Sequence, residues 1–158
     1  MVPSDSNSGP LQVRPATAAD AAHLVSFNLA MAWETEHKRL DPEVLAAGVR
    51  SVFEQPARGR YWVAEAGGVV QGGLMVTYEW SDWRNKWFWW IQSVYISPDF
   101  RGRSIYRAMY AFVKELATKR GEVCGFRLYV EKENVHAQKV YEQLGMHESY
   151  YLVYEEET

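Results

Sequence analysis

The chain has 158 residues, enough for one domain that buries roughly two thirds of its unfolded surface. Its 17 basic and 20 acidic residues argue against broad electrostatic binding to nucleic acid or to an anionic membrane. The single cysteine excludes an internal disulfide, and no His or Cys spacing is typical of a metal site. No segment resembles a signal peptide or a membrane span, so we expect a soluble, cytoplasmic protein without a metal.

Hydrophobic periodicity predicts a mixed α+β domain. Residues 1–10 are rich in Ser, Pro and Gly, so we expect a disordered tail there and a single domain over residues 11–158. Alternating apolar positions predict six strands, over residues 11–14, 61–66, 69–78, 87–96, 124–130 and 150–154. Apolar residues at helical spacing predict four helices, over residues 18–33, 42–55, 105–120 and 135–144.

Turn and cap residues support these boundaries. Gly67 and Gly68 supply the positive φ angles that a tight hairpin requires. Several residues fit helix ends: Thr17 with Asp20, Asp41 with Pro42, Asn134, Gly121 and Gly145. The strand, helix and strand between residues 94 and 130 suit a right-handed crossover between parallel neighbours, so we expect a mixed sheet flanked by helices.

The segment over residues 94–113 joins a strand, a loop and a helix. The strand stops at Ser97 and Pro98, and a loop over residues 101–104 precedes the helix. Such a loop directs backbone N–H groups and the positive end of a helix dipole to one point, where a pyrophosphate would bind. A basic surface turn would show the same pattern.

Two motifs in the second half of the chain resemble the GNAT superfamily of acyl-coenzyme A-dependent N-acyltransferases. The first, VYISP followed by RGRSIY over residues 101–106, is similar to the family's pyrophosphate loop. The second combines Asn134, Ala137, Tyr141, Gly145 and Met146 at the family's spacing. The resemblance implies a GNAT-like fold, with a mixed, mostly antiparallel twisted sheet of about six to seven strands and about four helices.

The resemblance implies acetyl-coenzyme A (coenzyme A) as the bound cofactor. Backbone groups of Val94, Tyr95 and Ile96 are expected to pair with the pantetheine arm. The remaining cofactor-binding residues that the motifs imply are Arg101, Gly102, Arg103, Ser104, Ile105, Tyr106 and Asn134. Ser104 and Tyr106 depart from the small residues usual in the family, and the Ser104 side chain near the phosphates predicts a reduced affinity.

The family's mechanism implies direct transfer to a primary amine in a ternary complex. Tyr141 is the expected general acid toward the coenzyme A sulfur, and its alternative role is that of a core aromatic. Glu79 is the candidate base for the amine, directly or through water, and a solvated turn acid is the alternative. A backbone N–H near Val94 is the implied oxyanion donor.

The acceptor amine is expected beside the first two helices and a Trp-rich turn. Aromatic faces and carboxylates suit a cationic amine, and the candidate residues are Trp33, Glu34, Trp80, Asp82, Trp83 and Gln92. The same tryptophans would also suit a core or a subunit interface. Gln92 and Ser93 stand where polyamine acetyltransferases of the superfamily look acidic, which disfavours a polyamine acceptor.

Three classes of function each fit some of these sequence features. The motifs favour an N-acetyltransferase acting on a small molecule or side chain. We expect a homodimer with no nucleic-acid or membrane partner. A non-catalytic acyl-coenzyme A-binding regulatory module is the alternative, because it would keep the loop without using Tyr141 or Glu79. A nucleic-acid stacking protein would exploit the aromatic residues, but the acidic composition and the lack of a basic stripe weigh against it.

Overall fold

The computed structural model describes residues 9–158, so residues 1–8 of the predicted tail lie outside the described part. The chain divides into two units, over residues 9–128 and 129–158. The first unit contains the strands β1 (Leu11–Pro15), β2 (Arg60–Ala66), β3 (Val69–Ser81), β4 (Lys86–Ile96) and β5 (Val123–Leu128). Its α-helices are α1 (Ala21–Glu36), α2 (Pro42–Glu54) and α3 (Ile105–Arg120).

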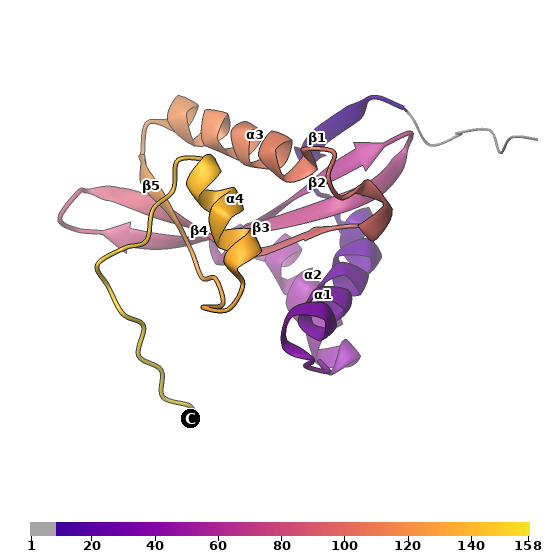
Figure 1. Ribbon diagram of the computed structural model, residues 1–158, viewed down its shortest axis with the longest axis horizontal. Coiled ribbons are helices and arrows are strands. Elements are labelled where there is room, and N and C mark those ends of the chain that lie inside the picture. The colour runs from indigo at the N-terminus through magenta and orange to yellow at the C-terminus, as the bar shows by residue number, and fades with distance from the viewer. Residues whose placement is uncertain (1–8) are drawn as a thin grey trace, which may run out of the picture. The chain divides into compact units, whose positions relative to one another are not determined.

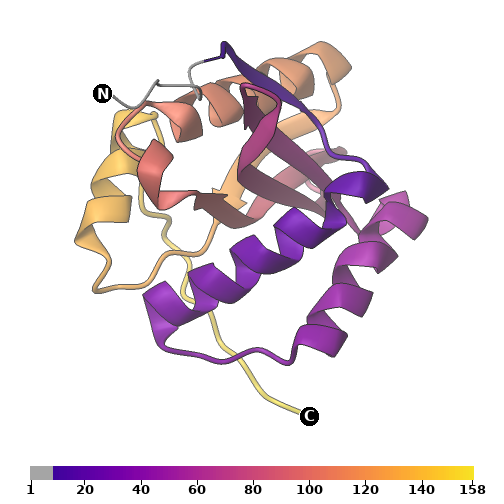
Figure 2. The same ribbon diagram turned by 90° about the vertical axis from the view of Figure 1, so that its right-hand side faces the viewer.

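The five strands form one sheet in the order β1-β2-β3-β4-β5. The first three pairings are antiparallel, and β4 pairs with β5 in parallel. The parallel pairing requires a crossover, which α3 provides on one face of the sheet, while α1 and α2 lie side by side on the other face (Figures 1 and 2). The predicted α+β class with a mixed, mostly antiparallel sheet is confirmed.

Apolar side chains fill both faces of the sheet. On the α1 and α2 face, one buried cluster joins two helices to two strands through Leu24, Val49, Val52, Tyr61, Val63 and Val70. On the α3 face, Trp62 and Trp89 are buried with their ring centroids 6.1 Å apart, and Trp89 also meets Phe126. Trp62 and Trp89 are therefore core residues, but neither belongs to the candidate acceptor set, whose Trp33, Trp80 and Trp83 are exposed.

The predicted turns and caps are present. Gly67 and Gly68 have φ angles of 59° and 80°, the positive values that a tight hairpin turn between β2 and β3 requires. The Asp41 carboxylate accepts hydrogen bonds from the backbone N–H groups of Glu43 and Val44, at 2.9 and 3.2 Å, and so caps α2. Gly121 ends α3 with a φ of 71°.

The structure corrects the strand count. Residues 150–154 were predicted as a sixth strand, but the described residues contain five strands and this segment is not one of them. Its Tyr, Leu and Val side chains are exposed. Their strand propensity is high, but a strand forms only where a neighbouring strand supplies hydrogen bonds, and no described pairing includes these residues. For the same reason β5 ends at Leu128, two residues earlier than predicted.

The start of the first helix also differs from the prediction. Residues Ala18–Asp20 form a 3-10 turn, and α1 begins at Ala21 and continues to Glu36. His37 follows in a left-handed conformation, with a φ of 52°. The predicted end at residue 33 was therefore three residues short, because no Gly or Pro marks the helix end in this part of the sequence.

The second unit contains one helix, α4 (Val135–Gln143). The Asn134 side chain accepts a hydrogen bond from the Ala137 backbone N–H at 3.1 Å, which confirms its prediction as the N-cap. Gly145 follows the helix with a φ of 91°, as a glycine that ends a helix often does.

An ion-pair cluster fastens β1 to β2 and to the start of α1. The Arg14 guanidinium donates to both Asp20 oxygens at 2.8 and 3.0 Å and to Glu65 at 3.0 Å. The Thr17 backbone N–H also donates to Asp20, at 2.7 Å. The hydrogen bond from Arg14 outweighs the effect of burial and lowers the pKa of Asp20, which is 5% exposed.

We predict that Asp20→Asn lowers the free energy of unfolding at pH 7 by about 1 to 3 kcal/mol, because charge-assisted hydrogen bonds in a buried site are lost. An unfolded Asp titrates near pH 4 and the folded Asp20 titrates lower. The stabilisation is therefore complete above about pH 4 and is lost as the pH falls through the folded pKa.

Urea denaturation at pH 7 and pH 3 measures this difference. The gap between wild type and Asp20→Asn should narrow at pH 3. Glu115→Gln is the control, because Glu115 pairs with Lys119 on the exposed surface of α3 and should change stability little. Equal effects of the two substitutions at pH 7 would contradict the structural role of Asp20.

Candidate functional site

The site begins where β4 separates from β5. The parallel ladder ends at the pair of Ile91 and Leu128, whereas β4 continues to Ile96 and remains paired with β3 on its other side. Within residues 9–128, the edge of β4 over residues 92–96 that faces away from β3 therefore has no strand beside it. We call this the open edge of β4. Its backbone N–H and C=O groups are available to an extended ligand, as at other unpaired strand edges.

A β-bulge interrupts β4 at the start of this open edge. Met75 pairs with Ser93 and Val76 pairs with Ile91, which leaves Gln92 as the extra residue. The Gln92 amide nitrogen donates to the Thr77 hydroxyl at 2.8 Å and so fixes its side chain against β3. Bulges re-aim side chains and are common next to active sites. Sequence periodicity does not locate this bulge, because it depends on the register between β3 and β4.

The predicted pyrophosphate loop joins this strand to α3. Gly102 has a φ of 76° and open space where a Cβ would lie. Ser104 occupies the N-cap position of α3 in a left-handed conformation, with a φ of 60° and no capping hydrogen bond from its side chain. The first N–H groups of a helix have no acceptor within the helix, so the start of α3 presents donors and a positive dipole end. Residues 102–104 are exposed, which leaves the loop accessible to an anion.

Arg101 is held over the end of β4 by three contacts. Its Nε donates to the Ile96 carbonyl at 3.0 Å, Nη2 donates to Glu34 at 2.7 Å, and the guanidinium lies 5.2 Å from the Tyr95 ring centroid. The Tyr95 hydroxyl also donates to Glu34, at 2.8 Å. Partial burial would raise the pKa of Glu34, but the hydrogen bonds from Arg101 and Tyr95 outweigh it, so the pKa is lowered.

This cluster connects Glu34 to the predicted cofactor-binding residues. The sequence placed Glu34 in the acceptor site, whereas the structure joins it to two predicted cofactor-binding residues, Tyr95 and Arg101. Glu34 thus links the end of α1 to the loop that follows β4. The neighbouring predicted residue Arg103 lies over the Phe100 ring at 4.7 Å, Ile105 is buried, and Tyr106 is half-buried.

Glu79 lies on β3 between two donors that the sequence analysis missed. The Trp90 indole N–H donates to one carboxylate oxygen at 3.0 Å, and the Arg127 guanidinium forms an ion pair with the other oxygen. Arg127 also lies 3.7 Å from the Phe88 ring centroid. Trp90 pairs with Arg127 in the parallel register of β4 and β5, so their side chains lie on the same face of the sheet. The sequence alone does not specify this register and so could not pair them.

The other predicted acceptor residues divide into two groups. Trp33 lies near the end of α1, with the Arg39 guanidinium 5.3 Å from its ring centroid. The second group lies at the turn between β3 and β4: Trp80 packs edge-on against Trp87, and Asp82 accepts a hydrogen bond from the backbone N–H of Trp83, which is 87% exposed.

These two groups lie at opposite ends of β4. Glu34, next to Trp33, contacts Tyr95, whereas Trp80 pairs with Trp87 at the start of the strand. From Trp87 to Tyr95 the strand spans roughly 25 Å at about 3.3 Å per residue. The structure does not bring Trp33 and Glu34 together with the Trp80, Asp82 and Trp83 turn.

Tyr141 and Asn134, the residues of the second motif, lie in the unit over residues 129–158. The Asn134 side chain caps α4, and Tyr141 is on that helix. Burial raises the pKa of the Tyr141 phenol above its usual value, so the phenol keeps its proton at neutral pH.

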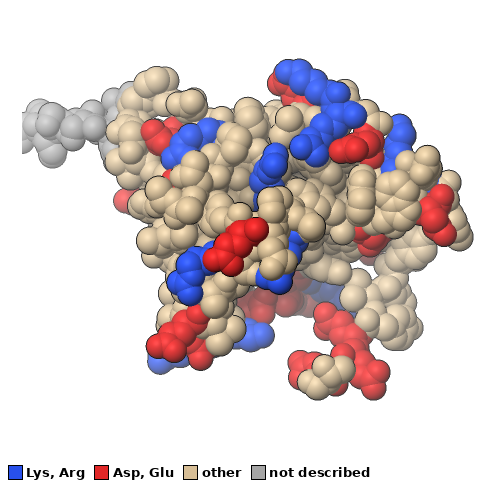
Figure 3. All heavy atoms as spheres, turned by 180° about the vertical axis from the view of Figure 1, so that it is seen from behind, with Lys and Arg blue, Asp and Glu red and all other residues tan. Residues whose placement is uncertain are grey.

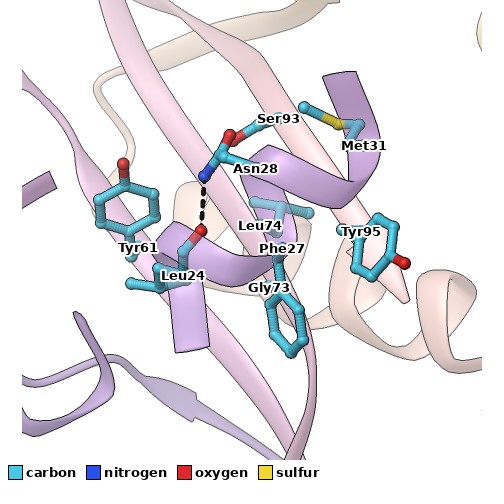
Figure 4. A pocket seen from close by; sticks show the side chains of 9 residues that line it. All are labelled: Leu24, Phe27, Asn28, Met31, Tyr61, Gly73, Leu74, Ser93 and Tyr95. Carbon is cyan, nitrogen blue, oxygen red and sulfur yellow. Dashed lines mark hydrogen bonds between the residues drawn. The ribbon is translucent and has the colours of Figure 1, made fainter. Parts of the chain in front are cut away.

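A pocket lies between α1 and the sheet (Figure 4). Most of its lining is apolar or aromatic: Leu24, Phe27, Met31, Tyr61, Leu74 and Tyr95. Asn28 and Ser93 add polar groups, and the Asn28 amide nitrogen donates to the Leu24 carbonyl at 2.9 Å. The sequence could have indicated that Asn28 faces the sheet, because it lies four positions after the inward-facing Leu24 and so on the same face of the helix.

The face of the molecule in Figure 3 has mixed surface charge. Figure 3 shows acidic and basic side chains interspersed over the visible face rather than gathered in a basic stripe. Among residues 9–158, no helix is both long and apolar enough to span a bilayer. In the same range, no three His, Cys, Asp or Glu side chains group closely enough to hold a metal ion.

Comparisons with known proteins agree on one family. The profile of the Acetyltransferase (GNAT) family matches residues 24–146. The crystal structure of a possible acetyltransferase from Clostridium difficile 630 is 40% identical, with a TM-score of 0.89 over 94% of this chain and 97% of that chain. A search of curated proteins finds no match.

Two more distant structures share the fold. The aminoglycoside N-acetyltransferase AAC(6')-Iy in complex with CoA is 18% identical, with a TM-score of 0.77 over 99% of each chain. A ribosomal-protein-alanine N-acetyltransferase from Brucella melitensis biovar Abortus 2308 is 14% identical, with a TM-score of 0.74 over 94% of this chain and 100% of that chain.

We predict that Ser104→Gly increases the free energy of unfolding by up to about 1 kcal/mol. A left-handed conformation costs an L-residue roughly 1 to 2 kcal/mol, and the greater freedom of Gly in the unfolded chain offsets only part of this gain. Ser26→Gly is the matched control, because Ser26 is exposed within α1 and its replacement should destabilise by about 0.5 kcal/mol. Urea denaturation compares them, and equal destabilisation would show that Ser104 is not strained.

Proposed function

The chain belongs to the acetyltransferase (GNAT) family, and from this premise we propose that it transfers the acetyl group of acetyl-coenzyme A to a primary amine. The acceptor is a small molecule or a side chain, and transfer is direct within a ternary complex. The observation that carries this proposal is the open edge of β4, which leads into a glycine-containing loop and the start of α3. Membership of the family makes the protein an acyltransferase that uses acyl-coenzyme A.

The described residues fit the cofactor in two ways. Backbone groups of Val94, Tyr95 and Ile96 would bind the pantetheine arm along the open edge of β4, as an added strand would. The donors of residues 101–106 would bind the pyrophosphate, since Gly102 leaves the loop uncovered. Bound acetyl-coenzyme A supplies an acetyl group activated as a thioester. Asn134 contributes by capping α4, the helix that carries Tyr141.

Arg101 has a defined place in this proposal. Its contacts with Ile96, Tyr95 and Glu34 hold the guanidinium beside the loop before any ligand binds. A positioned cation loses less side-chain entropy when it contacts a phosphate. Glu34 therefore acts as a positioning residue for the cofactor side, in addition to its predicted place beside the acceptor.

The proton transfers are assigned to two side chains. Tyr141 donates a proton to the departing thiolate, a role that the family motif supports, and its raised pKa keeps the phenol protonated. Glu79 accepts the amine proton. Glu79 lies four residues beyond Met75, the residue of β3 that pairs with Ser93. Four residues span roughly 13 Å along a strand. The proton therefore reaches Glu79 through water. A backbone N–H near Val94 stabilises negative charge on the acyl oxygen.

A non-catalytic acyl-coenzyme A-binding module remains the alternative function. Both functions predict that coenzyme A raises the melting temperature, because a ligand of the native state stabilises it. Only the enzyme predicts release of free coenzyme A thiol from acetyl-coenzyme A when amines are added. An amine panel with a thiol reagent as readout therefore separates the two. Binding without thiol release for any amine would favour the regulatory module, and no thermal shift at millimolar coenzyme A would contradict both.

We predict that Tyr141→Phe lowers kcat by ~100- to 10,000-fold, because a general acid typically contributes that much. Coenzyme A affinity should stay nearly unchanged, since only one hydroxyl is removed. Tyr154→Phe is the matched control, because Tyr154 is exposed near the end of the chain and should leave kcat unchanged. A folded Tyr141→Phe enzyme with wild-type kcat would assign Tyr141 a structural role.

We predict that Glu79→Gln lowers the rate near neutral pH and that the rate recovers in part at higher pH. A protonated amine has no lone pair, and more free amine is present as the pH rises. Glu122→Gln is the control, because Glu122 pairs with Arg120 on the exposed surface. Rates of Glu79→Gln that equal those of wild type across the whole pH range would remove Glu79 from the mechanism.

We also propose a homodimer and a cytoplasmic location. The apolar side chains of residues 150–154 are exposed and provide a candidate dimer surface, since large exposed apolar patches often mark interaction sites. Size-exclusion chromatography with light scattering measures the mass directly. A monomer at micromolar concentration would contradict the dimer.

A further inference from the structure

We propose that Thr77 on β3 is a positioning residue for the transfer reaction. Through Gln92 it fixes the β-bulge of β4, and the bulge in turn aims the backbone N–H of Val94 at the acyl oxygen. This inference rests on the proposed function, because it assigns a further residue to that same transferase. Three observations support it: the place of Gln92 in the bulge, the contacts of the Thr77 side chain, and the direction of the Val94 backbone.

The bulge leaves Gln92 without a partner in the ladder of β3 and β4. Met75 pairs with Ser93, and the next pair along the strands is Val76 with Ile91. Among the described strands, none flanks Gln92 on its other side, because the parallel pairing of β4 with β5 ends at Ile91. Gln92 is also exposed. A bulged residue locally disrupts the pairing of its strand, so its conformation needs another contact to hold it.

The Thr77 hydroxyl provides this contact. It accepts a hydrogen bond from the Gln92 side-chain amide nitrogen at 2.8 Å, which connects the bulged residue to β3. Among residues 9–158, neither of these two side chains forms a hydrogen bond with any other residue. Thr77 pairs with Trp90 in the ladder, so the bond crosses from the regular pairing before the bulge to the extra residue itself. One side-chain hydrogen bond thus ties the bulge to β3.

The methyl group of Thr77 keeps the hydroxyl in this direction. A Cβ on Gly59, just before β2, would lie 3.3 Å from the methyl carbon, so the methyl lies on the β2 side of β3. Thr is β-branched and stiff at χ1, so a methyl on the side of β2 leaves the hydroxyl turned toward β4. Val has the same shape without the hydroxyl, and Ser has the hydroxyl without the methyl.

The backbone N–H of Val94 faces the open edge of β4. The Ser97 N–H donates to the Gln71 carbonyl on β3 at 2.8 Å. Backbone groups of successive residues point to opposite sides of a strand, so the N–H of Val94, three residues before Ser97, points away from β3. Only Ser93 separates Val94 from the bulged Gln92. A change in the bulge would therefore change the direction of this donor.

Misdirection of this donor should affect the reaction rate more than cofactor binding. Negative charge on the acyl oxygen grows only in the transition state, so a well-aimed donor lowers the barrier and raises kcat. The other contacts of the bound cofactor would stay in place. Thr77 lies two residues from Met75, the partner of Ser93, and this separation is roughly 7 Å along a strand. Thr77 therefore acts through Gln92 and not on the reacting atoms.

Three variants test the role of the hydroxyl in acetyl transfer. Thr77→Val removes it, and the loss of one exposed neutral hydrogen bond should lower kcat about 3- to 10-fold, while coenzyme A affinity changes less than about twofold. Thr77→Ser keeps the hydroxyl and should retain at least about half of the wild-type kcat. Thr118→Val is the matched control, because the Thr118 hydroxyl donates to the Lys114 carbonyl on the exposed surface of α3. It should leave kcat unchanged.

A double-mutant cycle tests whether Thr77 acts through Gln92. In a Gln92→Ala background, Thr77→Val should change kcat by less than about twofold, because the bond between the two side chains is already gone. Independent effects would multiply, and they would overturn the proposed route through Gln92. Thiol release from acetyl-coenzyme A with the best amine of the panel measures kcat for each variant.

Hydrogen exchange in the ligand-free protein reports on the bulge without any turnover. Thr77→Val should speed amide exchange about threefold or more in peptides that cover residues 91–94, because a segment that is held less firmly opens more often. Thr118→Val should leave exchange in these peptides unchanged.

The two kinds of measurement separate the inference from the proposed function. Faster exchange in Thr77→Val, with no thiol release for any amine, would contradict the proposed function and leave Thr77 as the residue that holds the bulge. Equal exchange in wild type and Thr77→Val would overturn the inference whether or not the chain is a transferase. A folded Thr77→Val enzyme with wild-type kcat, or a Thr77→Ser enzyme as slow as Thr77→Val, would overturn it too.

Discussion

The site depends on the point at which β4 loses its parallel neighbour. As far as Ile91, the strand is paired on both sides, and beyond it only β3 continues alongside. A strand inside a sheet has no backbone groups left for a ligand, whereas one with an open edge presents a row of donors and acceptors. Gln92 forms a bulge at this transition, and the chain then leads through Gly102 into α3. An extended ligand with an anionic end matches this order of features.

Arginine pairing gives the site its electrostatic character. Arg101 and Arg127 each bind a carboxylate on a different strand or helix, so the ion pairs join α1 to the loop after β4 and β3 to β5. Both pairs are partly exposed, and such pairs contribute little to stability. Their main effect is on position and on net charge: the guanidinium groups are held in place, and the carboxylates attract a second cation less strongly.

The sequence predicted most of the fold, but it did not specify the contacts of the candidate site that depend on strand register. Local sequence was enough to predict the helix caps and turns at Asp41, Gly67, Asn134 and Gly121, because caps and tight turns depend on a few neighbouring residues. The prediction of a strand at residues 150–154 was wrong, because strand pairing depends on residues distant in the sequence and not on local propensity alone. The ion pair of Glu79 with Arg127 and the bulge at Gln92 depend on register between strands, which periodicity does not specify. The left-handed Ser104 was visible only as a departure from the expected glycine.

Hydrogen exchange tests the central claim, that a ligand pairs with the open edge of β4 and the start of α3. Coenzyme A at saturating concentration should slow amide exchange in peptides that cover residues 92–96 and 102–107, because their N–H groups would become hydrogen-bonded or covered. Peptides from α2 should exchange at the same rate with and without the ligand. Binding of coenzyme A that leaves residues 92–107 unprotected would contradict the account.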